Sequence, residues 1–214
     1  MKKQTRDIII GTVAVGAAVI ALYYAFGGRS QKIDLDTYQV LGAVAAEETA
    51  KLLGNKGEVL VMAPDSGSYK NPSVEAELAA FEKMLKKQKG MKVKAERIQI
   101  SPMLMMATGG GVPPEQFFKA LEQHTGVGAV VLFFGFPQLR DEEIQKLKKS
   151  GVKAVVVSSF RSGYKQLMAQ QVIHLAIMPR LDTSETAKPV AQTVRERFDQ
   201  DFTIVTPADA AALP

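Results

Sequence analysis

Side chains that could bind a ligand gather in five short segments rich in turn-forming residues, at 64–71, 101–112, 135–138, 158–163 and 179–183. The candidate ligand-binding residues in these segments are Asp65, Ser66, Ser68, Tyr69, Phe136, Gln138, Ser158, Arg161, Arg180 and Asp182. Their carboxylate, hydroxyl, amide and guanidinium groups can replace the hydration that a small polar ligand loses on binding. The sequence therefore predicts a site for such a ligand, provided that the fold brings the segments together.

Two groups of these candidates also have a purely structural interpretation. Backbone amides in the segment 64–71, ahead of a helix, could receive an anion, but Asp, Ser and Gly also build turns, and turn formation alone explains its composition. Arg161 or Arg180 could clamp a carboxylate or phosphate, whereas a salt bridge with Asp182 would only stabilise the loops. We favour the structural interpretation in both cases.

Two further motifs indicate chemistry that their surroundings do not support. Gly109-Gly110-Gly111 could approach a phosphate closely, but no Lys-Ser/Thr pair follows and Pro113 removes a donor, so a hinge or loop is favoured. Met103, Met105 and Met106 could bind Cu(I), but no His or Cys lies beside them, so packing or a contact surface is favoured. We expect no metal and no cofactor.

Catalytic signatures are scarce in this sequence. It has no cysteine, which excludes disulfides, thiolate metal sites and a thiol nucleophile. His124 and His174 lie outside the five segments; His174 sits in an apolar run typical of a core strand, and His124 lies near a helix C-terminus. No nucleophile-elbow, zinc-protease, calcium-loop or dinucleotide motif occurs. An enzyme that uses Ser or Asp stays open as an alternative.

The N-terminal region predicts a membrane anchor. Residues 8–26, IIIGTVAVGAAVIALYYAF, carry no charge and as a helix would cover nearly all of the ~30 Å hydrocarbon core. Lys2, Lys3 and Arg6 precede them, which favours a cytoplasmic N-terminus. A cleaved signal peptide is the alternative, since Ala25 and Gly27 suit a cleavage site. We therefore divide the chain into a basic flank (1–7), an anchor or signal peptide (8–26), a linker (27–36) and an extracytoplasmic domain (37–214).

The charge distribution agrees with this division. Four basic residues and one acidic residue lie in residues 1–30, so much of the net charge of +5 belongs to the anchor region. The remaining chain is close to balanced, which gives nucleic-acid binding little support. We expect a single-pass protein of the inner membrane whose domain lies in the periplasm or at the cell exterior.

Helical and strand patterns alternate from residue 37 onward. Strands are predicted at 58–63, 92–100, 127–134, 152–157, 172–178 and 202–206. Helices are predicted at 38–53, from Pro72, from Pro113, at 139–149, and around Val190, Val194 and Phe198. This alternation predicts an α/β domain, a three-layer αβα sandwich with a mostly parallel sheet of about six strands. Ligands bind such sheets at the carboxyl ends of the strands, where the five segments should meet.

Several runs resemble the C-terminal lobe of type I periplasmic binding proteins, the family of sugar-binding receptors and repressor sensor domains. The runs are YQVLGAVAAEETAKLLGNKGEVLVMAPDSG, FEKMLKKQKGMKVKAERI, GVGAVVLFFG, QLMAQQVIHLAIMPR and FTIVTPADAAALP. The chain departs from the family in holding one lobe, and in placing Gly135-Phe136-Pro137 and Ser158-Ser159-Phe160 where the family has Asn and Asp. The resemblance implies a substrate-binding fold without a defined sugar.

We conclude from the sequence that the chain is a membrane-anchored extracytoplasmic binding or interaction module of unknown ligand. A single lobe leaves its cleft open, so a second copy or another envelope protein is expected to cover it. Exposed Phe136, Phe160 and Tyr164 are expected to contribute to that contact. A hydrolase-like extracytoplasmic enzyme and a ligand-free envelope scaffold are the alternatives.

Overall fold

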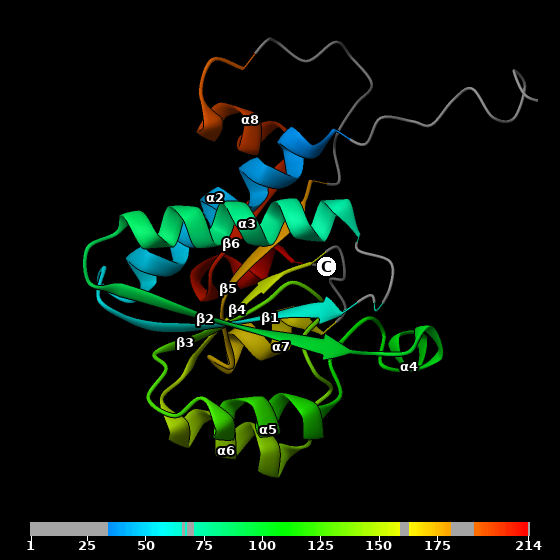
Figure 1. The fold of residues 1–214 in the computed structure, drawn as a ribbon. Coiled ribbons are helices and arrows are strands. Elements are labelled where there is room, and N and C mark those ends of the chain that lie inside the picture. The colour runs from blue at the N-terminus through cyan, green and yellow to red at the C-terminus, as the bar shows by residue number, and fades with distance from the viewer. Residues whose placement is uncertain (1–33, 66, 68–70, 159–162, 181–190, 214) are drawn as a thin grey trace, which may run out of the picture. The chain divides into compact units, whose positions relative to one another are not determined.

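A six-stranded sheet organises the computed structural model of this chain, with strand order β2-β1-β3-β4-β5-β6 (Figure 1). The strands are β1 (Gly57–Asp65), β2 (Met91–Gln99), β3 (Ala129–Leu132), β4 (Lys153–Val157), β5 (Ile173–Pro179) and β6 (Phe202–Val205). The first five strands in chain order run parallel to one another, and β6 pairs antiparallel with β5. The predicted mostly parallel sheet of about six strands is confirmed.

The structure describes residues 34–65, 67, 71–158, 163–180 and 191–213. Among these residues, no helix combines the length and the apolar character that crossing a bilayer requires. The predicted anchor at 8–26 lies outside the described residues, as does the basic flank. Residues 35–214 form one compact unit.

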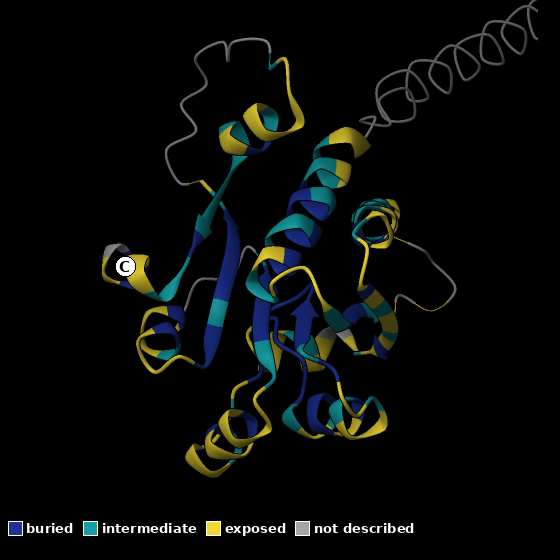
Figure 2. Cartoon of the chain, turned by 90° about the vertical axis from the view of Figure 1, so that its left-hand side faces the viewer, coloured by how far each residue is buried: buried dark blue, intermediate teal, exposed yellow. Residues whose placement is uncertain are grey.

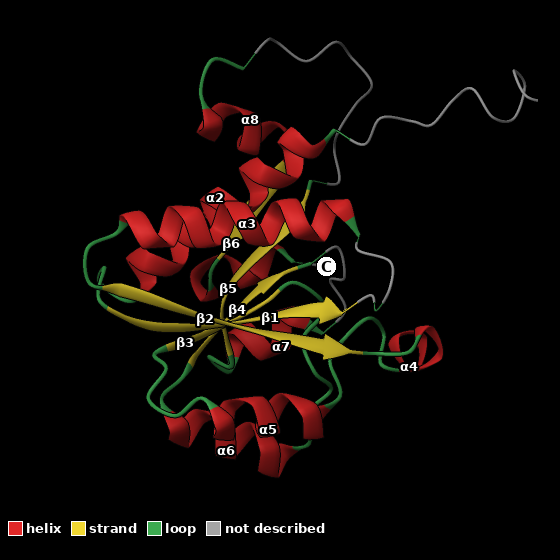
Figure 3. Cartoon of the chain, viewed as in Figure 1, coloured by secondary structure: helices red, strands yellow, loops and turns green. Residues whose placement is uncertain are grey.

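Helices cover both faces of the sheet (Figures 1 and 3). The helices are α2 (Leu35–Leu52), α3 (Pro72–Lys87), α4 (Pro102–Ala107), α5 (Pro114–Gln123), α6 (Asp141–Ser150), α7 (Tyr164–Ala169), α8 (Val194–Asp201) and the 3-10 helix η2 (Pro207–Ala212). α2, α3 and α8 pack on one face, and α5, α6, α7 and η2 pack on the other. The three layers are those predicted from the alternation of helix and strand patterns.

The two halves of the core follow from the alternation of side chains along each strand. In β1, Val59 and Val61 face the layer of α2 and α3, whereas Leu60 and Met62 face the layer of α5. All four side chains are fully buried, and Figure 2 shows the central strands in the colour of buried residues. Strands covered on both faces need apolar residues at consecutive positions, which explains their uninterrupted apolar sequences.

Local sequence determines where the helices begin and end. Asn71 caps α3, its side-chain oxygen accepting a hydrogen bond from the Ser73 amide, and Pro72 occupies the first helical position. α6 carries acidic residues in its first turn and lysines in its last, and ends at Gly151 in the left-handed conformation with φ of 69°. These ends were predicted to within two residues.

The segment 101–112 differs from the predicted loop, because it contains α4. Ser101 caps this short helix by accepting a hydrogen bond from the Leu104 amide. After it, Gly111 forms a parallel bridge with Gly135, and a side chain on Gly111 would collide with the Phe136 carbonyl. Gly111 therefore serves close backbone packing.

Candidate ligand-binding cleft

A cleft of about 450 Å³ opens at the carboxyl ends of β1, β3, β4 and β5. Its lining residues are Thr37, Tyr38, Leu41, Pro64, Asn71, Ser73, Val74, Glu77, Met105, Gly110, Phe133, Phe134, Val157, Ser158, Ile177, Pro179 and Phe202. The strand order reverses between β1 and β3, both of which end at this cleft. In open α/β sheets a ligand binds outside the strand ends at such a switch point. The position of the cleft is the one predicted from the sequence.

Polar groups enter the cleft mainly from two helices. Thr37 and Tyr38 come from the first turn of α2, and Ser73 and Glu77 come from the first half of α3. The other lining residues are mostly apolar and include the aromatic rings of Phe133, Phe134 and Phe202. A mostly apolar wall with a few convergent polar groups is the usual composition of a small-molecule site.

A close crossing of α2 and α3 brings these polar groups together. Gly42 is buried, and a methyl group at this position would overlap the carbonyl oxygen of Glu77. The absence of a side chain at Gly42 thus lets the backbones of the two helices approach. Because Thr37 and Tyr38 lie one turn before Gly42 on α2, the crossing places them beside the α3 side of the cleft.

Glu77 is the cleft residue with the most unusual environment. Burial raises the pKa of its carboxyl group to about 7, because little water remains to solvate the charged form. Among the described residues no hydrogen bond or ion pair involves this carboxyl group. Its neighbours on α3 differ: Glu75 pairs with Arg97 at 2.9 Å, and Glu82 pairs with Lys86 at 3.0 Å. Glu77 is therefore a partly buried acid that lacks a counter-charge within the described chain.

The predicted site residues are only partly brought together. Ser158 lines the cleft. Asp65 is exposed and accepts a hydrogen bond from the Gly67 amide at 2.9 Å, the geometry of a turn. Gln138 is exposed and donates to the Thr108 carbonyl, and the Arg180 side chain donates to the Asp199 carbonyl. The remaining polar candidates lie outside the described residues: Ser66, Ser68, Tyr69, Arg161 and Asp182.

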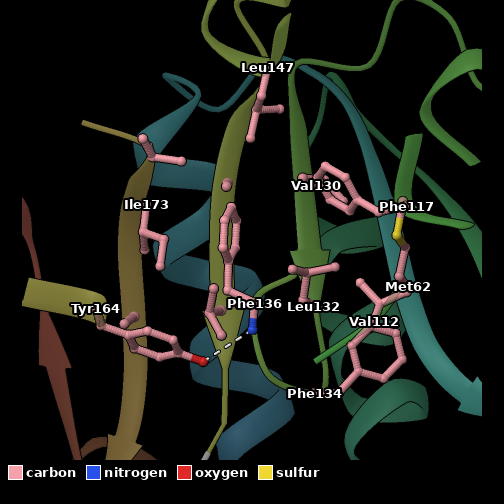
Figure 4. Packing of buried hydrophobic residues seen from close by; sticks show 14 of the residues in the cluster. Met62, Val112, Phe117, Val130, Leu132, Phe134, Phe136, Leu147, Tyr164 and Ile173 are labelled. Atoms are coloured by element: carbon pink, nitrogen blue, oxygen red, sulfur yellow. Dashed lines mark hydrogen bonds between the residues drawn. The ribbon is translucent and has the colours of Figure 1, made fainter. Parts of the chain in front are cut away.

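The prediction that Phe136 and Tyr164 are exposed is wrong. Phe136 is 5% exposed and Tyr164 is 3% exposed, and both belong to the core on the α5 side. The Phe136 amide donates a hydrogen bond to the Tyr164 hydroxyl at 3.3 Å, and the Phe136 ring packs on Phe117, with 6.1 Å between centroids (Figure 4). This hydrogen bond satisfies the phenol, so both rings can be buried. Phe160 lies outside the described residues.

Sequence reasoning missed Glu77, Tyr38 and Phe202, because it searched only the loops. A signal for Glu77 was available, since Glu77 follows Val74 by three residues and precedes Phe81 by four. These spacings place a carboxylate on the apolar stripe of α3, where an acid is costly to bury unless it has a role.

The histidines have structural roles. His174 accepts a hydrogen bond from the Ala154 amide at its Nδ1, and burial lowers its pKa. The His124 Nε2 lies 3.1 Å from a Glu96 carboxylate oxygen. Neither histidine lines the cleft, so the described part of the cleft contains no Ser–His pair. The described residues also hold no group of His, Cys, Asp and Glu that could bind a metal.

A second hollow, of about 610 Å³, lies along the outer surfaces of α2, α3 and the start of α8. Its lining includes small residues such as Ala43, Ala76 and Ala80, and the charged residues Lys83 and Arg197. It is larger than the cleft, but it lies away from the strand ends and has no buried polar group. We therefore take the cleft as the candidate ligand site.

Solved structures that resemble this chain include sugar-binding proteins. An arabinose-binding protein from Geobacillus stearothermophilus, AraP, matches with a TM-score of 0.57 and 16% identity, over 83% of this chain and 63% of AraP. A sugar-binding protein of a sugar ABC transporter from Bacillus halodurans matches with a TM-score of 0.55 and 14% identity, over 83% and 64% of the two chains. GanP, a glucose-galactose binding protein from Geobacillus stearothermophilus, matches with a TM-score of 0.53 and 11% identity, over 80% and 61%.

The match is one of structure rather than of sequence. No family model matches the chain, and no curated protein matches it in sequence. The chain spans less than two thirds of the length of each of the three proteins above. At these identities the comparison establishes the fold. The chain thus has the α/β fold of periplasmic sugar-binding proteins, and the resemblance inferred from its sequence is confirmed at that level.

Proposed function

We propose that this chain is a membrane-anchored extracytoplasmic binding module that holds a small polar ligand in the cleft at the carboxyl ends of its strands. The observation that carries the proposal is Glu77, a partly buried carboxyl group without a described partner in the wall of the cleft. A ligand that satisfied this group would offset its lost hydration. The fold supports a binding role, since the solved structures that resemble it bind sugars.

The residues around Glu77 favour a binding function over a catalytic one. A hydrolase needs a nucleophile with a base, or two acidic groups at suitable separation. Glu77 is the only Asp, Glu, Lys, Arg or His among the described lining residues. One acid can orient a ligand but lacks the second group that these mechanisms require.

Filling the cleft should abolish ligand binding. Ser73 lines the cleft at the second position of α3, and we expect Ser73→Trp to weaken binding at least 10-fold because the indole would occupy the cavity. Glu115→Trp is the matched control, since Glu115 is exposed and also stands directly after the first proline of its helix. Calorimetry of the full chain in a non-ionic detergent, against sugars, amino acids, nucleosides and small amines, measures the effect. Equal binding by both variants would place the ligand elsewhere.

The anchor at 8–26 and the export of the domain belong to this proposal and rest on the sequence. We expect the chain to stay in the membrane pellet after alkaline carbonate extraction, and to be degraded by protease added from the extracytoplasmic side. The mass of the mature chain separates an anchor from a cleaved signal peptide. Recovery in the cytosolic fraction would contradict both forms of the proposal.

A partner covering the cleft also belongs to this proposal, whether a second copy or another envelope protein. Its support is α4, where Met103 and Met106 are 81% and 83% exposed while Met105 lines the cleft. Exposed methionines often form adaptable contact surfaces. Light scattering of the full chain in detergent tests the second-copy form, and a monomer at high concentration would exclude it.

A further inference from the structure

We infer that the ligand of the cleft is a small organic cation, an ammonium group on an apolar body. Glu77 is its counter-ion, and the aromatic rings that line the cleft are its second contact. This inference rests on the proposed binding function and narrows it to one chemical class. A cationic ligand requires a negative charge and aromatic ring faces from the cleft, whereas a neutral sugar requires several paired hydrogen-bonding groups.

The charged side chains among the described lining residues favour a cation over an anion. Glu77 is the only carboxylate among these residues, and no Lys, Arg or His accompanies it there. An anionic ligand would be repelled by ionised Glu77, whereas a cation would gain an ion pair in surroundings less polar than water. The nearest carboxylate on the same helix, Glu75, is already paired with Arg97 and is not a lining residue.

The shape of the cleft suits a cation with an apolar body. Tyr38, Phe133 and Phe202 supply aromatic rings from α2, the end of β3 and the start of β6. Ring faces attract cations, and more strongly where water is excluded. Hydroxyl groups of Thr37 and Ser73 also line the cleft and can accept hydrogen bonds. A volume of about 450 Å³ accommodates a ligand of metabolite size.

A pair of molecules with the same shape tests the inference. Choline carries a trimethylammonium group, and 3,3-dimethylbutan-1-ol has the same outline with carbon in place of nitrogen. We expect the full chain in non-ionic detergent, at pH 8, to bind choline at least 10-fold more tightly than the neutral alcohol. Titration into empty micelles corrects for partitioning of the alcohol. Glu77→Gln should remove most of this difference, because only the attraction of the aromatic rings then remains, whereas Glu115→Gln should leave it unchanged.

The outcomes separate this inference from the proposed function. Equal binding of choline and the alcohol, or a preference for choline that Glu77→Gln does not reduce, overturns the inference. If neutral sugars bind instead and Ser73→Trp prevents their binding, the binding function stands and the cationic ligand class is wrong. If neither the cations nor the neutral compounds bind at millimolar concentration, both are wrong.

Discussion

Glu77→Gln is expected to stabilise the folded protein by about 2–3 kcal/mol at pH 8 and to leave its stability nearly unchanged at pH 4. Burial raises the Glu77 pKa from 4.5 to about 7, so between these values the folded state binds a proton that the unfolded state has released. Stability therefore falls as pH rises through this window, and the loss is complete once the folded protein has ionised. Glutamine has a similar shape without the charge, so it avoids this loss.

The measurement is chemical denaturation of the full chain at half-unit steps from pH 4 to pH 8, followed by circular dichroism. Glu115→Gln, an exposed carboxyl group on α5, is the control and should run parallel to the unchanged protein. His174 acts in the opposite direction: burial lowers its pKa below 6.5, so its contribution to stability is lost as pH falls through that region. The variant should therefore show stability rising with pH up to about 6.5. Parallel curves for Glu77→Gln and the unchanged protein would mean that Glu77 is solvated.

This result bears directly on ligand binding. A bound cation would favour the charged form of Glu77 and lower its pKa, so choline should stabilise the protein more at pH 8 than at pH 5.

The framework of the fold was predictable because apolar runs indicate strands and charged ends indicate where helices begin and end. The run VGAVVLFF gives β3, which is buried on both faces, and the acidic start and basic end of DEEIQKLKKS give α6. α4 and α7 were missed, since six residues are too few for a helical period to be recognised. In α4 the neighbouring prolines and glycines also favoured a loop.

The place of the site was predictable, but most of its residues were not. Parallel strands must end on one edge, so the carboxyl ends of β1, β3, β4 and β5 meet whatever their loops contain. The residues facing the cleft come instead from helix turns, such as Tyr38 and Glu77, and from a strand start, Phe202. Their convergence depends on the angle at which α2 crosses α3 at Gly42, a tertiary feature that no local pattern encodes.

The burial of Phe136 and Tyr164 shows why the exposure of a side chain is hard to predict from local sequence. Both residues lie outside the strands, yet a backbone amide reaches the phenol and removes the cost of burying it. Such a pairing joins positions 28 residues apart and leaves no mark in either local sequence. Two of the aromatic residues that do line the cleft, Phe133 and Phe134, lie directly after β3.

Phe81→Ala is expected to lower the free energy of unfolding by about 3–5 kcal/mol and also to weaken choline binding. Phe81 on α3 is fully buried, and its ring meets Phe133 edge to face, with centroids 5.7 Å apart and planes at 89°. Phe133 lines the cleft, so the cavity left by alanine removes the support behind a wall of the ligand site. Denaturation gives the first effect, and calorimetry at 15 °C gives the second.

Phe117→Ala is the matched control for this pair of effects. Phe117 is also fully buried, but it belongs to the core on the α5 side and packs on Phe118 and Phe136, which do not line the cleft. It should lose a similar amount of stability while keeping the affinity of the unchanged protein for choline. Phe81→Leu keeps most of the buried volume and serves if the alanine variant fails to fold. Equal loss of affinity in the Phe81 and Phe117 variants would mean that affinity follows the overall stability of the fold. The packing of Phe81 behind Phe133 would then have no specific effect on the cleft.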